Sequence, residues 1–194
     1  MSKRIPRRFV VDPVDDVQVL SPMHKGASGT ASLNGHLQDA LNPAKTRVSV
    51  AGANFRLHDK VMQIRNNYDK QVFNGDMGRI SAINEEFRQM QIDFEGRQID
   101  YAFSELDEVV PAYAVSVHKS QGSEFPVVVM PILTQHFIML QRNLVYTAVT
   151  RGRRLVVLVG TKKAMAIAVK NDRPRQRYTQ LAARLASLRP APAV

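Results

Sequence analysis

The sequence of 194 residues contains no cysteine. A disulfide framework and a thiolate metal site are therefore both excluded, and no other metal site is predicted. No apolar run approaches the roughly 20 residues that a membrane-spanning helix needs, and the basic amino-terminal segment lacks the apolar core of a signal peptide. We therefore expect a cytoplasmic bacterial protein with no membrane partner.

Acidic residues are scarce in the carboxyl-terminal part of the chain. From residue 141 onward there are twelve lysines and arginines against one acid, Asp172, whereas residues 84–108 hold eight acids against two arginines. The net charge is +10, which favours a polyanionic partner through nonspecific attraction. The uneven distribution indicates two regions with different roles.

Residues 141–160, QRNLVYTAVTRGRRLVVLVG, predict a helix that leads directly into a strand. The helix has too little polarity for a surface helix, so we expect it to be buried and to end near Arg151. Gly152 stands where a helix needs a left-handed closing residue. The run LVVLVG is typical of a strand covered on both faces, as parallel strands are. The pair predicts one half of an α/β repeat.

Residues 113–126, YAVSVHKSQGSEFP, begin as a strand and then place hydroxyl, imidazole, ammonium, amide and carboxylate groups between Ser116 and Glu124. Core packing does not require this density of polar groups. A second apolar run, VVVMPIL, follows at once. The loop is therefore expected between two strands at the edge of a sheet, where open α/β folds place their ligands.

The other segments predict a small inserted β-region between helices and strands of the main sheet. Short strands with a period of two are expected in KVMQIR, QVF, MGRISAI, FRQMQIDF and QIDY, with Asn74-Gly75 as a tight turn. A strand at 17–20 precedes a loop and a helix that Thr30 caps and Asn42-Pro43 ends. A capped helix ends at Asn171 and another lies within 173–194, whereas residues 1–16 are predicted to be a linker or leader without a role.

Two of these segments resemble known motifs. YAVSVHKSQGSEF is similar to motif V, and RNLVYTAVTRGRR to motif VI, of superfamily I DNA helicases of the RecD-like branch. That branch includes the exodeoxyribonuclease V alpha subunit and the helicase parts of conjugative relaxases, and the resemblance covers roughly residues 17–170. It implies an α/β fold, with a RecA-like parallel sheet flanked by helices over 17–76 and 104–172. It also implies a small inserted SH3-like β-barrel over 77–103.

The resemblance implies roles for individual residues. The motif VI arginine of the family is an arginine finger, so Arg151 is the expected catalytic residue; its guanidinium matches phosphate oxygens and keeps its proton. Lys25 lies in a loop that looks like motif IV. The other assignments are nucleotide binding for Gly122, Glu124 and Lys25, DNA binding for Ser116, His118, Asn74 and Gly75, and a position between the two ligands for Lys119 and Gln121.

Several of these residues also have a simpler explanation. An arginine in the last turn of a helix complements the helix dipole. Lys25 suits a solvated surface loop, and the family commonly has arginine in that neighbourhood. Asn74-Gly75 is already explained as a turn, and the arginines of 173–194 suit the solvated face of an amphipathic helix.

The sequence has neither a GxxxxGK[ST] loop nor an acidic magnesium-binding motif of the DEx type. ATP with Mg²⁺ is therefore expected to bind mainly to a first RecA-like domain of the same parent protein. The isolated chain is expected to be inactive as an ATPase and helicase. Its expected partners are single-stranded DNA, that first domain and subunits of a helicase–nuclease complex. A noncatalytic nucleic-acid or protein-binding module on a helicase-like scaffold is the competing hypothesis.

Overall fold

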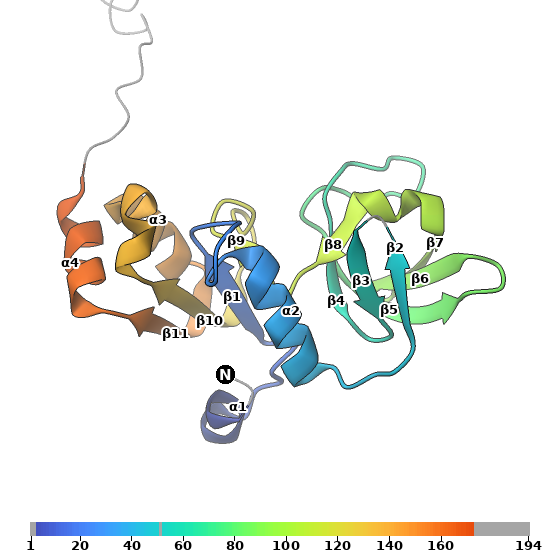
Figure 1. The fold of residues 1–194 in the computed structure, drawn as a ribbon, viewed down its shortest axis with the longest axis horizontal. Coiled ribbons are helices and arrows are strands. Elements are labelled where there is room, and N and C mark those ends of the chain that lie inside the picture. The colour runs from blue at the N-terminus through green and yellow to red at the C-terminus, as the bar shows by residue number, and fades with distance from the viewer. Residues whose placement is uncertain (1–2, 51, 173–194) are drawn as a thin grey trace, which may run out of the picture.

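The computed structural model describes residues 3–50 and 52–172, and these form two bodies that lie side by side (Figure 1). One body is built on a parallel sheet and the other on an antiparallel sheet. The helix predicted within 173–194 lies outside the described residues. Among the helices of the described part, none combines the length and apolar character needed to span a bilayer.

The parallel sheet has the strand order β11-β10-β1-β9. The strands are β1 (Val17–Ser21), β9 (Ala114–Ser116), β10 (Phe125–Ile132) and β11 (Gly152–Gly160). The predicted α/β architecture, a parallel sheet flanked by helices, is confirmed. Successive side chains of a strand point to opposite faces, so Val127 and Val129 belong to one apolar cluster and Val128 and Met130 to another.

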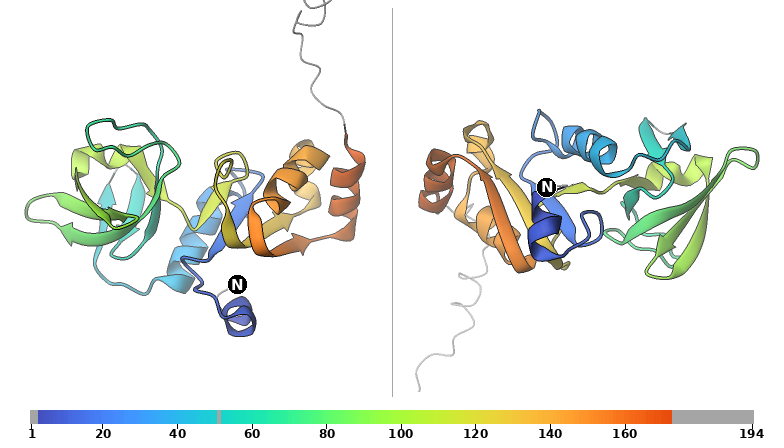
Figure 2. Two further views of the ribbon diagram at one scale, coloured as in Figure 1. Left: turned by 180° about the vertical axis from the view of Figure 1, so that it is seen from behind. Right: turned by 90° about the horizontal axis from the view of Figure 1, so that it is seen from below.

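Helices cover both faces of this sheet. On one face lie α1 (Arg4–Phe9) and α2 (Thr30–Leu41), and on the other lie η2 (Thr134–Met139), α3 (Arg142–Val149) and α4 (Lys162–Lys170). Figure 2 shows α2 and α3 on opposite sides of the strands. The short helix α1 falls in the segment predicted to be a linker or leader.

The second body is inserted between β1 and β9, which are neighbours in the parallel sheet. Its antiparallel sheet has the order β7-β6-β5-β4-β8, and the hairpin β2–β3 packs on the same apolar core. The sheet extends beyond the predicted bounds of 77–103 on both sides, because β4 and β8 pair with each other. The strands are β2 (Arg47–Val50), β3 (Ala53–Arg56), β4 (Lys60–Gln63), β5 (Met77–Asn84), β6 (Gln89–Phe94), β7 (Arg97–Ala102) and β8 (Val109–Pro111), with η1 (Phe103–Glu108) before β8.

Buried polar groups join the two bodies. The carboxylate of Asp59, which is fully buried, accepts hydrogen bonds from Gln38 Nε2 (2.5 Å), Asn42 Nδ2 (2.7 Å) and Tyr113 Oη (2.9 Å). Burial raises the pKa of Tyr113, and the negative charge of the Asp59 carboxylate raises it further. These donors come from α2, from the residue that follows it and from the residue that precedes β9, so Asp59 fixes the second body against the first.

A second junction involves the amino-terminal segment. The ammonium of Lys60 in β4 is buried and donates to the carbonyl oxygen of Val14 at 2.9 Å. Burial lowers the pKa of Lys60 to about 8, and the nearby carboxylate of Asp15 opposes this effect. Residues 11–16 therefore connect the two bodies.

Three predictions about 141–160 are wrong. Gly152 has no left-handed backbone and instead begins β11, where an added Cβ would lie 2.5 Å from Val156 Cγ2. The strand β11 is at the sheet edge and its side chains are largely exposed or half-buried. Helix α3 buries one face only, because Tyr146 is 71% exposed. A strand at the sheet edge and an amphipathic helix can contain as many apolar residues as fully buried elements do. The apolar content of 141–160 therefore did not reveal how exposed these elements are.

Other local predictions had mixed outcomes. The helix α2 ends before Asn42-Pro43 as predicted, and Thr161 caps α4 by accepting a hydrogen bond from Ala164 N at 3.1 Å. The prediction that Thr30 caps α2 is wrong, since its hydroxyl bonds to His24 Nδ1 instead. QVF forms no strand and contributes only an isolated bridge at Val72.

Candidate functional site

The polar loop 117–124 connects β9 to β10 and passes the strand β1 that lies between them. It leaves the carboxyl end of β9, where Ser116 lies opposite Ser21, and enters β10 at its amino end. Only its first part therefore lies at the sheet edge where ligands were expected. Val117 and Ser120 are buried and anchor the crossing, and the Ser120 hydroxyl donates to Val117 O at 2.8 Å.

The exposed members of this loop are the predicted ligand-binding residues. His118, Lys119 and Gln121 are all exposed, and within the described part of the chain their side chains make no hydrogen bond or ion pair. The loop backbone is closed by its own hydrogen bonds, such as Gln121 N to His118 O at 3.3 Å. The side chains are thus held on a structured backbone while their polar groups remain available.

Arg151 follows α3 directly and contacts the end of this loop. Its Nη1 donates to Ser123 O at 3.1 Å and its Nε to Thr147 O at 3.3 Å, and Nη2 lies 3.3 Å from Thr150 Oγ1. All three acceptors are neutral. Among the described residues no carboxylate forms an ion pair with this half-buried guanidinium, so its positive charge is not neutralised.

Glu124 lies beside Arg151 but is paired with Arg153. The distance from Arg153 Nε to Glu124 Oε2 is 2.8 Å, and both side chains are substantially exposed. Gly122 has a φ of +89°, a conformation that favours glycine and turns the chain toward Glu124. The ion pair between Arg153 and Glu124 was not predicted from the sequence. The signal that could have indicated it is the presence of two arginines, Arg151 and Arg153, only two residues apart.

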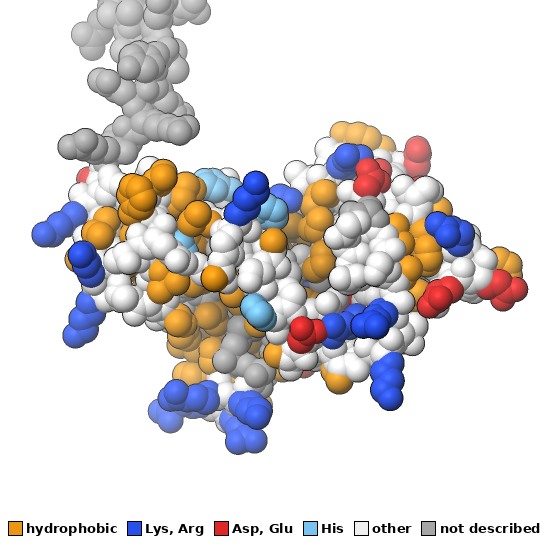
Figure 3. Space-filling model, in the orientation of Figure 1, with side chains coloured by type: hydrophobic (Ala, Val, Ile, Leu, Met, Phe, Trp, Pro, Cys, Tyr) orange, Lys and Arg blue, Asp and Glu red, His pale blue; other side chains and the backbone are white. Residues whose placement is uncertain are grey.

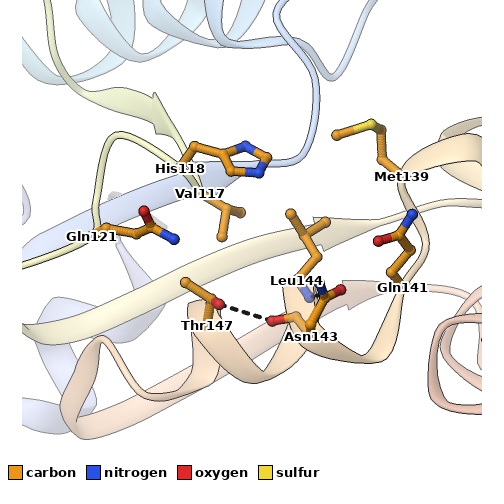
Figure 4. Close-up of a pocket in the computed structure, with 8 residues that line it drawn as sticks. All are labelled: Val117, His118, Gln121, Met139, Gln141, Asn143, Leu144 and Thr147. Atoms are coloured by element: carbon orange, nitrogen blue, oxygen red, sulfur yellow. Dashed lines mark hydrogen bonds between the residues drawn. The ribbon is translucent and has the colours of Figure 1, made fainter. Parts of the chain in front are cut away.

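One small hollow of about 110 Å³ lies between the loop and α3 (Figure 4). His118 and Gln121 approach it from the loop, while Asn143 and Thr147 approach it from the helix. The two helix residues are four positions apart and therefore share a face of α3. This spacing is visible in the sequence, but no site was predicted from it. The hollow is lined by Val117, His118, Gln121, Met139, Gln141, Asn143, Leu144 and Thr147.

A larger hollow of about 750 Å³ opens between the two bodies, and Figure 3 shows the surface indented there. Ser116 and Lys119 line it. Partial burial lowers the pKa of Lys119, although the side chain as a whole is exposed. Ser116 at the end of β9 and Lys119 of the loop therefore line one hollow, and His118 and Gln121 of the loop line the other.

Lys25 lies in the loop that follows the carboxyl end of β1, the sheet edge opposite to the one where Arg151 and Glu124 lie. It is exposed. The loop is fixed by Ser28, whose hydroxyl lies 2.7 Å from Nε2 of the fully buried His136. Burial lowers the pKa of His136. The structure does not bring Lys25 together with the other residues predicted to bind nucleotide.

Asn74 and Gly75 belong to the second body, in the long connection between β4 and β5. Gly75 has a φ of +104° and donates its N–H to Gln63 O at 2.9 Å, so a turn explains the glycine. Asn74 is exposed. Across residues 3–50 and 52–172, no group of three or more His, Cys, Asp or Glu side chains could hold a metal ion.

Two family models match the chain. Residues 33–94 match the SH3 domain of ATP-dependent RecD-like DNA helicases, and residues 111–159 match the UvrD-like helicase C-terminal domain. The ATP-dependent RecD2 DNA helicase of Deinococcus radiodurans is 39% identical over 157 residues, covering 81% of this chain and 22% of the relative. The RecBCD enzyme subunit RecD of Haemophilus influenzae is 26% identical over 162 residues, covering 84% and 24%.

Solved structures of similar fold are helicases. A structure of two coordinating Pif1 helicases at forked double-stranded DNA matches with a TM-score of 0.59 and 16% identity, covering 89% of this chain and 44% of that one. Pif1 helicase from Bacteroides in complex with ADP-AlF3 and single-stranded DNA matches with a TM-score of 0.57 and 16% identity, covering 93% and 47%. These likenesses support the RecA-like fold.

The chain spans about a quarter of the length of the curated relatives named above. The first match ends inside the inserted β-body, at the end of β6, and the second begins shortly before β9. The chain therefore carries a domain of the RecD-like helicase SH3 family and a domain of the UvrD-like helicase C-terminal family, and its relatives include RecD and RecD2 helicases.

Proposed function

We propose that this chain is the second motor domain of an ATP-dependent DNA helicase. In this role it supplies an arginine finger, Arg151, and part of the track for single-stranded DNA. A first RecA-like domain of the parent protein supplies the Walker A loop, which this sequence lacks. The 39% identity to an ATP-dependent DNA helicase supports the proposal.

The observation that carries the proposal is the difference between two neighbouring arginines. Arg153 is neutralised by Glu124, whereas Arg151 is held only by neutral oxygen atoms. A transferring phosphoryl group needs positive charge as its transition state forms. An arginine that keeps its charge uncompensated, and that lies at a helix end beside a polar loop, is suited to supply it.

The contacts of Arg151 also define how it would act. Its hydrogen bonds to Thr147 O and Ser123 O join α3 to the polar loop. Turning the guanidinium toward a γ-phosphate would exchange these neutral acceptors for charged ones, which form stronger hydrogen bonds. Mg²⁺ bound with ATP would neutralise phosphate charge on the first domain. Gly122 and Glu124 are proposed to lie near the nucleotide because they adjoin Arg151.

The same loop carries the proposed DNA contacts. Ser116 lies directly before it and His118 at its beginning, and Ser123 near its end accepts the hydrogen bond from Arg151. A movement of Arg151 on ATP binding would therefore be transmitted to the residues that contact DNA through one short segment. Alternation between the two states would couple hydrolysis to stepping along the strand.

A steady-state ATPase assay with single-stranded DNA tests the proposal. The isolated chain is expected to show no turnover above the buffer blank. The same chain joined to a RecA-like domain with a Walker A loop is expected to hydrolyse ATP. Turnover by the isolated chain would show that it contains a complete site, and a joined protein that binds DNA but remains inactive would favour a noncatalytic binding module.

A further inference from the structure

Exposed apolar side chains gather on the helices at the end of the parallel-sheet body that is remote from the inserted β-body (Figures 1 and 3). Phe137 and Ile138 of η2 are 64% and 70% exposed, and Val169 near the end of α4 is 46% exposed. Tyr146 on the outer side of α3 is exposed as well, and both η2 and α3 contact α4. These four residues define an apolar helix face that nothing in the described part of the chain covers.

The described part of the chain ends at this face. The carboxylate of Asp172 accepts a hydrogen bond from Arg142 Nη1 at 2.5 Å, and Arg142 Nε donates to Val169 O at 3.0 Å. Asn171 Nδ2 donates to Leu140 O, directly after η2, at 2.9 Å. The end of α4 is thus fixed between η2 and the start of α3, so the segment that follows Asp172 begins beside the apolar helix face.

That segment, residues 173–194, lies outside the described residues, and its sequence has an apolar side of its own. RPRQRYTQLAARLASLRPAPAV predicts a helix between Pro174 and Pro190, because proline suits the first turn of a helix and the region after its end. Three leucines recur at the spacing of one helix face and form a leucine seam: Leu181, Leu185 and Leu188. A helix of this length is marginal in water unless its apolar face is packed, so the seam needs an apolar partner.

The leucine seam and the apolar helix face are within reach of each other. A helix over residues 175–188 is about 21 Å long at about 1.5 Å per residue, and a short connection joins it to Asp172. Such a connection gives an effective concentration on the order of millimolar, which favours an intramolecular contact. Three other exposed aromatic side chains belong to the inserted β-body, at the opposite end of the molecule (Figure 1): Tyr68, Phe73 and Phe87.

We propose that the apolar helix face is the docking site for residues 173–194 of the same chain, with the leucine seam packed against η2 and α4. The inference concerns a contact within the chain and does not depend on the proposed motor function. Arg177 and Arg184 lie outside the seam, so their guanidinium groups stay in water while the leucines are buried. The docked segment braces α3, the helix that Arg151 follows.

Disulfide cross-linking tests the proposal in the full 194-residue chain, which has no cysteine of its own. Ile138→Cys is combined with one further cysteine within 173–194, and closure in oxidised glutathione is followed by non-reducing electrophoresis. Because a disulfide needs two Cβ atoms about 4 Å apart, at least one pair with the leucine seam is expected to close about tenfold faster than every pair with the opposite helix side. The seam series places the second cysteine at Leu181, Leu185 or Leu188, and the matched series places it at Gln180, Ala183 or Ser187.

A second change probes the apolar contact in the fastest pair of the seam series. Phe137→Ser is expected to slow its closure by about threefold or more, because it removes apolar surface from the docking site. Phe87→Ser removes a similarly exposed phenylalanine from the inserted β-body and is expected to change closure by less than about twofold. Equal closure in the two series, or no closure in the seam series, overturns the proposal. Cross-links between chains, at a rate that rises with protein concentration, also overturn it and assign the face to a second copy.

Discussion

The inserted β-body and the loop 117–124 use polar residues in opposite ways. At the base of the β-body, Asp59 is fully buried and accepts hydrogen bonds from Gln38, Asn42 and Tyr113. In the loop, His118 is exposed and its side chain bonds to none of the described residues. Buried polar groups must be paired to be tolerated, whereas exposed ones satisfy themselves with water until a ligand replaces it.

The comparison separates residues that build the site from residues that would use it. Buried polar groups orient the two bodies and thereby shape the hollow between them. Exposed polar groups on the loop contribute little to stability and are placed where a ligand can reach them. We therefore expect substitutions at the junction to change the free energy of unfolding, and substitutions in the loop to change binding or turnover.

The largest expected effect on stability comes from Asp59→Ala. This change removes one acceptor from three buried side chains and from the backbone N–H of Arg56, which donates to Asp59 at 2.7 Å. Unpaired buried donors make the expected loss of unfolding free energy about 3–5 kcal/mol. Urea denaturation followed by circular dichroism measures it.

Asp39→Ala is the matched control. Asp39 forms an exposed ion pair with Arg56, and such pairs contribute about 0–1 kcal/mol. The comparison between buried and exposed polar groups fails if the two variants lose similar amounts of stability.

A smaller effect is expected from the titration of Lys60. Its pKa of about 8 in the folded protein lies below the ordinary value of 10.5, so between these pH values the unfolded chain binds a proton that the folded chain has lost. Stability therefore rises with pH across this window, by up to about 3 kcal/mol. Lys60→Met is expected to lack this rise in pH-dependent urea denaturation.

Lys45→Met, at an exposed position, serves as the control and should keep the pH dependence of the wild type. An unchanged slope between pH 8 and pH 10.5 in Lys60→Met would contradict the assigned burial of its ammonium.

The sequence predicted the elements whose patterns are local. The alternation in 77–102 gave β5, β6 and β7, and the capped helix that was predicted to end at Asn171 is α4. The extent of the β-body was not predictable in this way, because β4 and β8 are separated by more than 40 residues and pair only in the folded chain. The burial of β11 was overestimated for the same reason, since strand order decides which strand lies at the edge.

The residue types of the candidate site were predictable from the sequence, but the contacts that these residues make and the hollows that they line were not. The polar residues between Ser116 and Glu124 identified the loop, and the structure places Arg151 beside it, where it donates a hydrogen bond to Ser123 O. The pairing of Glu124 with Arg153 and the separation of Lys119 from His118 depend on how the loop crosses the sheet. The path of a connection between two parallel strands leaves no periodic pattern in the sequence.

The central claim is tested most directly by the ATPase turnover of Arg151→Ala in the chain joined to a Walker-type RecA-like domain. Arg151→Ala is expected to lower kcat by about 1,000-fold or more, as for the loss of an arginine finger, while the Kd for single-stranded DNA changes by less than about threefold. Arg153→Ala, which removes an arginine already neutralised by Glu124, is expected to lower kcat far less. Turnover within about tenfold of the wild type in Arg151→Ala, or an equal loss in both variants, would contradict the assignment of Arg151 as the finger.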